Sequence, residues 1–352
     1  MPLFYVVPER NDAGIRQYLG SQGRELADRM RVLPCEELPS RRAFEPGTYI
    51  LAGLDQLGPG MLRLVRELHR KLDGRPGFRF LNHPRATLFR GELLDALHRR
   101  GHNDFRAVRA GGDLAGLRYP VFLRSDQAHD GAASPLLGSR AEIEEAIGRA
   151  LLRGRRLEDL LVVEFCATAG ADGSYRKYAA FRVADRVVPR HLARGADWML
   201  KYDDQAVTRE IAREELEYVR SNPHRERLAE IFEIARVGYG RIDYSLSGDR
   251  IQTWEINLNP VIGQDGSPAD RGPKNAIFYP AFAVALRATE VSYGAGPVSV
   301  DLDPETREAA SAEVGSRSPA RPAGRPAPAW IEPLARPVGR WVGRLARRLS
   351  AD

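Results

Sequence analysis

Polar and apolar residues alternate with a period of two along two neighbouring segments, residues 240–246 and 253–260. Such alternation predicts β-strands with one packed face and one polar face. On the first strand, one face is expected to carry Arg241, Asp243 and Ser245. On the second, the polar face is expected to carry Thr253, Glu255, Asn257 and Asn259, with Trp254, Ile256 and Leu258 pointing the other way. The short polar link between them predicts a β-hairpin.

The length of the turn decides which side chains of this hairpin meet. A three-residue loop at 248–250 puts Asp243 directly opposite Glu255, whereas a two-residue loop puts Asp243 opposite Trp254. We expect the three-residue loop, with the two carboxylates roughly 5 Å apart at Cβ. Asn257 then follows about 6.6 Å further along the same face.

Directly opposed carboxylates repel each other unless a cation lies between them. Carboxylate and amide oxygens are the ligands that Mg²⁺ prefers. The hairpin therefore predicts a magnesium site formed by Asp243, Glu255 and Asn257. The alternative is an exposed acidic hairpin whose charges face solvent.

The pair of segments resembles the metal-binding end of the ATP-grasp ligases, the superfamily of D-alanine:D-alanine ligase and glutathione synthetase. By this resemblance Asp243, Glu255 and Asn257 hold the Mg²⁺ ions that bridge the ATP phosphates. Arg241 matches a basic residue that steadies the transferred phosphoryl group. The sequence 259–261, Asn-Pro-Val, departs from the more usual Pro-Gly ending next to the acceptor site.

The same resemblance implies further nucleotide contacts. Arg124, at the end of an expected strand 119–124, takes the place of a phosphate-binding Lys before the flap loop 125–134, and Arg90 matches another ATP-contacting cation. In the expected strand 160–166, Glu164 and Phe165 match the hinge at adenine. Further along are Asp172 (ribose), Arg176 (nucleotide and acceptor substrate) and Lys201 (phosphates).

The pattern along the rest of the chain predicts an α+β protein. Strands are expected at 3–7 and 48–52, with helices at 13–31 and 60–71, which indicates a small α/β domain at residues 1–80. A short strand at 80–84 and a helix at 85–99 follow. By the resemblance, residues 81–300 form an ATP-grasp fold of two α+β subdomains that grip ATP.

The C-terminal part differs in composition. Residues 301–329 are rich in Pro, Ala, Ser and Arg, which predicts a disordered linker. Residues 330–352 predict a basic amphipathic helix, which is either a solvated tail or a segment that docks weakly on a membrane surface or a protein. The eight arginines beyond residue 314 outnumber two acids there, and the remainder of the chain holds 45 basic and 45 acidic residues. A neutral body gives no support for nucleic-acid binding.

The two cysteines, Cys35 and Cys166, predict neither a disulfide framework nor a zinc site, so a reducing cytoplasm is the expected location. No nucleotide-binding P-loop, Ser nucleophile elbow or His-Glu-x-x-His zinc motif occurs. The resemblance implies a Mg-ATP-dependent ligase that joins a carboxylate to an amine through an acylphosphate. The alternatives are an ATP-binding protein without turnover and a small-molecule kinase.

Overall fold

A computed structural model describes residues 1–127, 131–200, 208–263, 268–292 and 296–316. The chain divides into two units, Met1–Ser316 and Arg317–Asp352, and the described residues all belong to the first. The predicted amphipathic helix at 330–352 lies outside them. Within the described residues, five short 3₁₀ helices connect the larger elements: η1 (Glu9–Asn11), η2 (Arg24–Leu26), η3 (Cys35–Glu37), η4 (Leu54–Gln56) and η5 (Leu157–Asp159).

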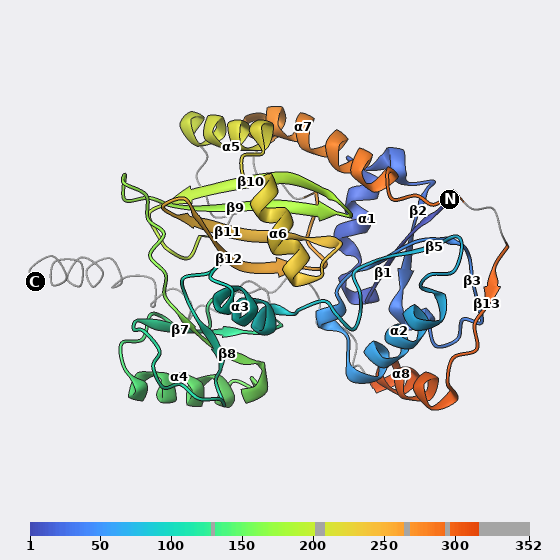
Figure 1. Cartoon of the computed structure of the whole chain (residues 1–352), viewed down its shortest axis with the longest axis horizontal. Helices are drawn as coiled ribbons and strands as arrows, with labels where there is room; N and C mark the ends of the chain where they lie inside the picture. Colours follow the sequence, from blue (N-terminus) through green and yellow to red (C-terminus); the bar gives the residue numbers. More distant parts are fainter. Residues whose placement is uncertain (128–130, 201–207, 264–267, 293–295, 317–352) are drawn as a thin grey trace, which may run out of the picture. The chain divides into compact units, whose positions relative to one another are not determined.

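The chain begins with a parallel sheet (Figure 1). It contains β1 (Leu3–Val7), β2 (Met30–Pro34), β4 (Gly47–Leu51) and β5 (Phe78–Leu81) in the order β2-β1-β4-β5. Helices α1 (Ala13–Gly20) and α2 (Pro59–Leu72) belong to this part. All five residues of β1 are buried, as expected for a continuous apolar strand covered on both faces. The predicted small α/β arrangement is confirmed.

The predicted helix at 13–31 is wrong beyond Gly20. The chain forms η2 and then pairs Met30–Pro34 with β1 as the parallel strand β2. Pairing along the whole of β1 satisfies backbone groups that a longer helix would have taken for itself. Tertiary pairing thus overrides the helical pattern there.

An antiparallel sheet follows in the order β10-β9-β11-β12. Its strands are β9 (Tyr175–Val183), β10 (Arg186–Gly195), β11 (Tyr239–Ser247) and β12 (Arg250–Asn257). The accompanying helices are α5 (Arg209–Ser221), α6 (Arg225–Ala235) and α7 (Pro268–Arg287), and Figure 1 shows α6 in front of this sheet. One apolar core runs from the parallel sheet into the antiparallel sheet.

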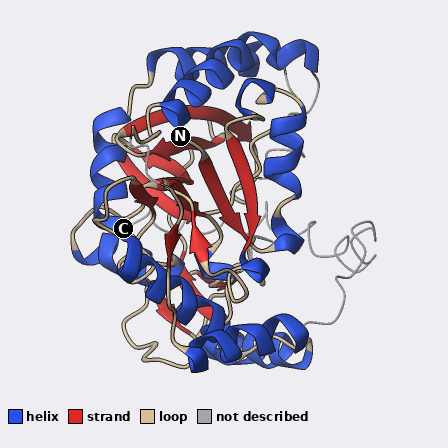
Figure 2. Ribbon diagram, turned by 90° about the vertical axis from the view of Figure 1, so that its right-hand side faces the viewer, coloured by secondary structure: helices blue, strands red, loops and turns tan. Residues whose placement is uncertain are grey.

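A smaller antiparallel sheet has the order β6-β8-β7 and its own apolar clusters. It contains β6 (Ala107–Arg109), β7 (Val121–Ser125) and β8 (Leu160–Glu164), with α3 (Arg90–Arg99) and α4 (Arg140–Leu152). Helix α3 begins later than the predicted residue 85, because the Phe89 backbone N–H is capped by the Glu92 side chain. Figure 2 shows helices flanking the strands of these sheets. The α+β class is confirmed, and the boundary after residue 80 stays a prediction.

The segment after residue 296 folds back on the N-terminal part. β13 (Val298–Ser299) pairs with β3 (Ala43–Phe44), and α8 (Pro304–Ser316) packs against α2. Residues 304–316 therefore correct the prediction of a disordered linker that starts at 301. Glu313 accepts hydrogen bonds from the backbone N–H groups of Gly60 and Met61, at the start of α2. A carboxylate at a helix N-terminus is favourable.

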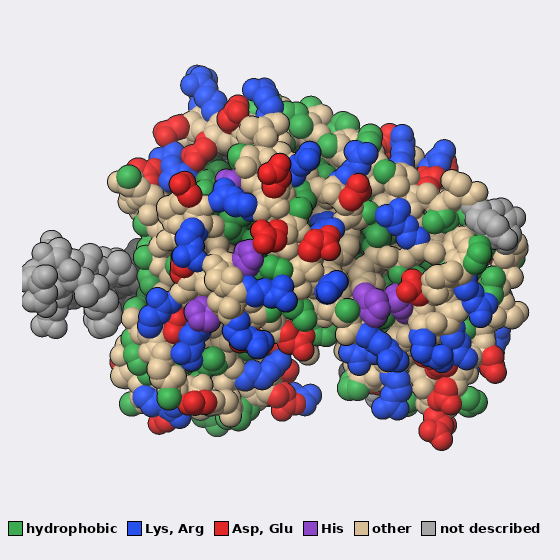
Figure 3. All heavy atoms as spheres, in the orientation of Figure 1, with side chains coloured by type: hydrophobic (Ala, Val, Ile, Leu, Met, Phe, Trp, Pro, Cys, Tyr) green, Lys and Arg blue, Asp and Glu red, His purple; other side chains and the backbone are tan. Residues whose placement is uncertain are grey.

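None of the described helices is both long and apolar enough to cross a bilayer. Basic and acidic side chains are interspersed over the face shown in Figure 3, in keeping with the neutral charge of the chain before its C-terminal tail.

Arg307 is the polar centre of the α8 contact. Its guanidinium is buried and donates to the backbone carbonyls of Pro39 (2.6 Å), Arg41 (3.1 Å) and Val300 (3.2 Å).

We expect Arg307→Ala to lower the free energy of unfolding in urea by about 2 to 3 kcal/mol, because buried carbonyls lose a charged donor. Arg31→Ala, which breaks an exposed pair with Glu45, should cost less than about 1 kcal/mol. Equal losses in the two variants would contradict this role.

Candidate functional site

The hairpin of β11 and β12 reaches its register in an unexpected way. Ser247 pairs with Arg250, so the turn contains two residues, and the predicted three-residue loop is wrong. A β-bulge after Asp243 nevertheless restores the pairing of Asp243 with Glu255, which confirms that opposition. A bulge adds one residue to one strand, here Trp254, and thereby shifts the register by one.

The same bulge changes which side chains share a face. Thr253 pairs with Tyr244 and so lies on the face away from Asp243, which corrects the prediction that it accompanies Glu255. The predicted direction of Trp254 is also wrong. Its indole N–H donates to Ser245 Oγ at 2.9 Å, and its ring stacks on Phe105.

Glu255 is buried, and its carboxylate binds two guanidinium groups. Arg124 from β7 donates to Oε2 at 2.8 Å, and Arg90 from the first turn of α3 donates to the same oxygen. Arg90 also donates to the backbone carbonyls of Ser125 and Asp126. Burial lowers the pKa of Arg124, and the charge of Glu255 opposes that shift. The two predicted phosphate-binding arginines are thus brought together at a predicted metal ligand.

Asp243 has its own cationic partners. Arg241 Nε donates to Oδ1 at 2.8 Å, and Lys177 Nζ lies 3.8 Å from Oδ2. Lys177 was missed by the sequence analysis, although the pattern contained a signal. It is one residue from Arg176 and therefore points to the opposite face of β9, and the pairing of Ala179 with Asp243 brings that face to the site.

The donor set fits a hard divalent cation. Asp243 and Glu255 offer carboxylate oxygens from neighbouring strands, and Asn257 adds an amide oxygen that accepts the backbone N–H of Asn259 at 2.9 Å. No group of three or more His, Cys, Asp or Glu side chains suited to a metal occurs among the described residues. A cation at this hairpin would therefore be held by two carboxylates and one amide, and it would compete with Arg90 and Arg124 for Glu255.

The row of paired residues that contains Asp243 continues to His191, which lies near further cationic side chains. His191 of β10 pairs with Ala179, which pairs with Asp243. Burial, followed by the charges of Arg241 and Lys274, holds the pKa of His191 well below its usual value. The cations next to Asp243 thus extend towards α7, where Lys274 is buried and lies 3.7 Å from the buried Glu215.

Asp172 and Arg176 lie in a different network. The Arg176 guanidinium donates to both carboxylate oxygens of Asp172 and to Glu214 of α5, and Arg194 joins the same carboxylates. The hydrogen bonds from Arg176 and Ser174 hold the pKa of Asp172 far below its usual value. Because Arg176 points away from the face that carries Lys177, the structure does not bring it to the Asp243 carboxylate.

The predicted hinge residues follow β8. Glu164 is fully buried and accepts the backbone N–H groups of Arg106 (3.0 Å) and Arg118 (2.9 Å), together with the Arg118 guanidinium. Its carboxylate therefore anchors the segment 106–118. Phe165 packs edge-on against Trp198. Lys201 lies outside the described residues.

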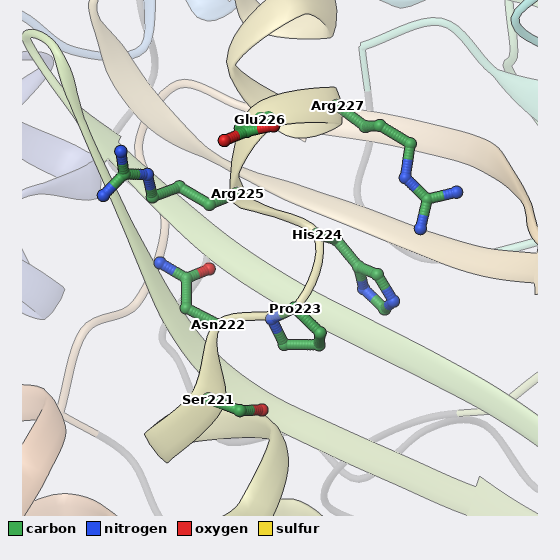
Figure 4. A pocket seen from close by; sticks show the side chains of 7 residues that line it. All are labelled: Ser221, Asn222, Pro223, His224, Arg225, Glu226 and Arg227. Atoms are coloured by element: carbon green, nitrogen blue, oxygen red, sulfur yellow. The ribbon is translucent and has the colours of Figure 1, made fainter.

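A cavity of about 440 Å³ lies elsewhere, at the turn between α5 and α6 (Figure 4). It is lined by residues 221–227 and by none of the predicted site residues. His224, one of its lining residues, bonds the Tyr244 hydroxyl through Nδ1 at 2.7 Å. Tyr244 and Asp243 are adjacent on β11, so this cavity belongs to the face opposite the hairpin carboxylates.

Comparison with known proteins gives matches to solved structures only. No protein-family model and no curated protein sequence matches the chain. D-alanine–D-alanine ligase from Bacillus anthracis matches with 14% identity and a TM-score of 0.46, covering 82% of this chain and 97% of that one. The same enzyme complexed with ATP gives 10% identity and a TM-score of 0.47 with the same coverage. L-amino acid ligase from Bacillus licheniformis gives 12% and 0.43, covering 83% and 75%.

Two of these solved structures bear the name D-alanine–D-alanine ligase, an enzyme of the family that residues 240–260 resemble.

The stability that the hydrogen bonds of Glu164 give to the fold is expected to depend on pH. Burial alone would raise its pKa, but hydrogen bonds from the Arg118 and Arg106 backbones and the Arg118 guanidinium outweigh burial and lower the pKa. A lowered pKa stabilises the fold above the unfolded value of about 4.3, and that stability is lost as the pH falls through the folded value. Glu164→Gln should therefore lose about 1 to 3 kcal/mol at pH 7, and the difference from wild type should shrink below pH ~4.

Urea unfolding at pH 7 and at about pH 3.5 measures this difference. Glu145→Gln, which breaks an exposed pair with Arg149, is the matched control and should change little at either pH. A Glu164→Gln deficit that is the same at both pH values would contradict the assigned hydrogen bonds.

Proposed function

We propose that this protein is a Mg-ATP-dependent ligase of the ATP-grasp type, which joins a carboxylate to an amine through an acylphosphate. The observation that carries the proposal is the pairing of Asp243 with Glu255 on neighbouring strands, with Arg90 from α3 and Arg124 from β7 converging on Glu255. Oxygen ligands for a metal and guanidinium groups for phosphate thus meet at one place.

Asp243, Glu255 and Asn257 would hold Mg²⁺, which when bound supplies charge neutralisation for the nucleotide phosphates. Arg90 and Arg124 would bind phosphate oxygens, since a guanidinium forms forked hydrogen bonds with them. Lys201 is proposed as a further phosphate contact. Phe165 at the end of β8 is proposed to face adenine, and Asp172 to reach the ribose.

Arg241 and Lys177 would steady the group that is transferred. A substrate carboxylate oxygen attacks the γ-phosphorus, the bond to the bridging oxygen breaks, and ADP leaves. The amine nitrogen then attacks the acyl carbon, phosphate leaves and the nitrogen loses a proton. The cations beside Asp243 stabilise negative charge on the phosphoryl oxygens throughout, which is the main catalytic effect that such a site offers.

The acceptor side is proposed to include Arg176 and the cations that continue towards α7. The Arg176 side chain would have to exchange Asp172 or Glu214 for substrate, because its donors are engaged by them in the structure. Cys35 is buried and Cys166 is half-buried, and we propose the cytoplasm as the location of the protein.

The test is an assay of the purified full chain with Mg-ATP and a panel of carboxylates paired with amines. We expect release of ADP and phosphate that requires both substrates, and a ligated product by mass spectrometry. Tight ATP binding without any release would instead indicate an ATP-binding protein without turnover. A phosphorylated product without ligation would indicate a small-molecule kinase.

The hairpin carboxylates give a sharper prediction. Asp243→Asn and Glu255→Gln keep the side-chain shape but remove a charged oxygen ligand, so each should lower ADP release about 100-fold or more, as expected for loss of electrostatic stabilisation. Asp249→Asn, in the exposed turn of the same hairpin, is the matched control and should keep its activity. Circular dichroism melting should show folded protein for all three. Full activity of Glu255→Gln would end the metal assignment.

A further inference from the structure

The predicted metal ligands are covered by cations in this structure. Glu255 holds Arg90 and Arg124, and Asp243 holds Arg241 and lies 3.8 Å from Lys177. Each of the two carboxylates thus has two cationic neighbours. These six side chains, four cations and two carboxylates, carry a formal charge of +2. A free divalent cation entering here meets the net positive charge of these side chains.

The pairs at Glu255 are well shielded from water. The side chains of Arg90 and Arg124 are only 4% and 12% exposed, and that of Glu255 is 11% exposed. Salt and water screen such pairs much less than surface pairs. The arginines therefore compete strongly with a metal for the Oε2 atom that both of them contact.

A nucleotide triphosphate would change this balance. Its phosphate oxygens are stronger acceptors for a guanidinium than a single carboxylate, because they offer more negative charge and a forked geometry. An arginine that turns to phosphate leaves Glu255 free for a cation. Transfer of the arginines to phosphate and binding of a cation to Glu255 favour each other. The Glu255 carboxylate cannot bind the arginines and the metal equally well at the same time.

Arg90 connects this exchange to the start of the flap loop. It donates to the Ser125 and Asp126 carbonyls, and the Asp126 carboxylate accepts the Gly91 backbone N–H (2.8 Å) and Arg109 (2.9 Å). These contacts fix the start of α3 to the end of β7, so the position of Arg90 is set by two elements as well as by Glu255.

We propose that Arg90 and Arg124 form an electrostatic latch on Glu255, which a nucleotide triphosphate opens, so that a divalent cation binds the Asp243–Glu255 pair only after the nucleotide has taken the arginines. The proposal rests on the proposed function, because it concerns the same nucleotide site. It adds that the site excludes free metal and that the order of binding is built into the hairpin.

The latch makes two predictions that simple loss of a ligand does not. Wild type should bind Mn²⁺ weakly without nucleotide, and Arg124→Gln should bind it about tenfold more tightly, because Glu255 loses a competitor. Conversely, Glu255→Gln should bind ATP in EDTA about tenfold more tightly than wild type, because both arginines are released. Calorimetry measures both affinities, and neither readout depends on turnover.

Two control variants separate the latch from a general effect of charge. Asp249→Asn removes the same charge from the exposed turn of the same hairpin but leaves the Arg90 and Arg124 contacts, so it should tighten metal-free ATP binding much less than Glu255→Gln. Arg31→Gln removes a distant positive charge and should leave Mn²⁺ binding unchanged. If Arg124→Gln does not fold, the comparison of Glu255→Gln with Asp249→Asn still decides.

Equal ATP affinities for Glu255→Gln and Asp249→Asn would overturn the latch, as would nucleotide-free Mn²⁺ binding in Arg124→Gln no tighter than in wild type. If either of these results is obtained and wild type still binds Mg-ATP, the latch is overturned but the proposed function stands. Wild type that binds no ATP, with or without Mg²⁺, would overturn the proposed function and the latch together.

Discussion

The opposition of two carboxylates across one pair of strands is the constraint on which the rest of the site depends. Asp243 and Glu255 are directly opposed, nearly buried and of like charge, an arrangement that is unfavourable without compensation. The compensating cations come from α3, β7, β9 and β11. The negative charge of this hairpin is therefore compensated only when strands of two separate sheets and the helix α3 keep fixed positions relative to each other.

Buried polar side chains also hold the parallel sheet against the hairpin. Asn82 has a φ of +71°, a conformation that Asn tolerates better than most residues. Its amide donates to the carbonyls of Leu51 and Tyr239 and accepts the Tyr239 backbone N–H. Asn259, just after the hairpin, accepts the Tyr5 hydroxyl and donates to the Asn11 carbonyl. The departure of 259–261 from the family pattern thus coincides with a contact to the N-terminal sheet.

The local pattern predicted most elements because strand and helix periods reflect local burial. The strands β1, β4, β8, β11 and β12 and the helix α2 were expected at nearly the observed bounds. The failures share a different cause. The helix expected through residue 31 gave way to pairing of β2 with β1, and the linker expected from residue 301 folds as α8 because α2 and the segment near Pro39 supply its partners. Both depend on contacts between residues far apart in sequence.

The sequence by itself determined the α+β class and the hairpin, because alternation and residue type depend on neighbours along the chain. The opposition of Asp243 to Glu255 was predicted from a turn length that is wrong. Only the tertiary structure decided how that opposition arises, through a bulge at Trp254 rather than a longer turn. It also decided that Arg90 and Arg124 share one oxygen of Glu255, that Lys177 approaches Asp243, and that Glu164 is occupied by the segment 106–118. Ion pairs between distant segments depend on the packing of whole sheets, which no local pattern contains.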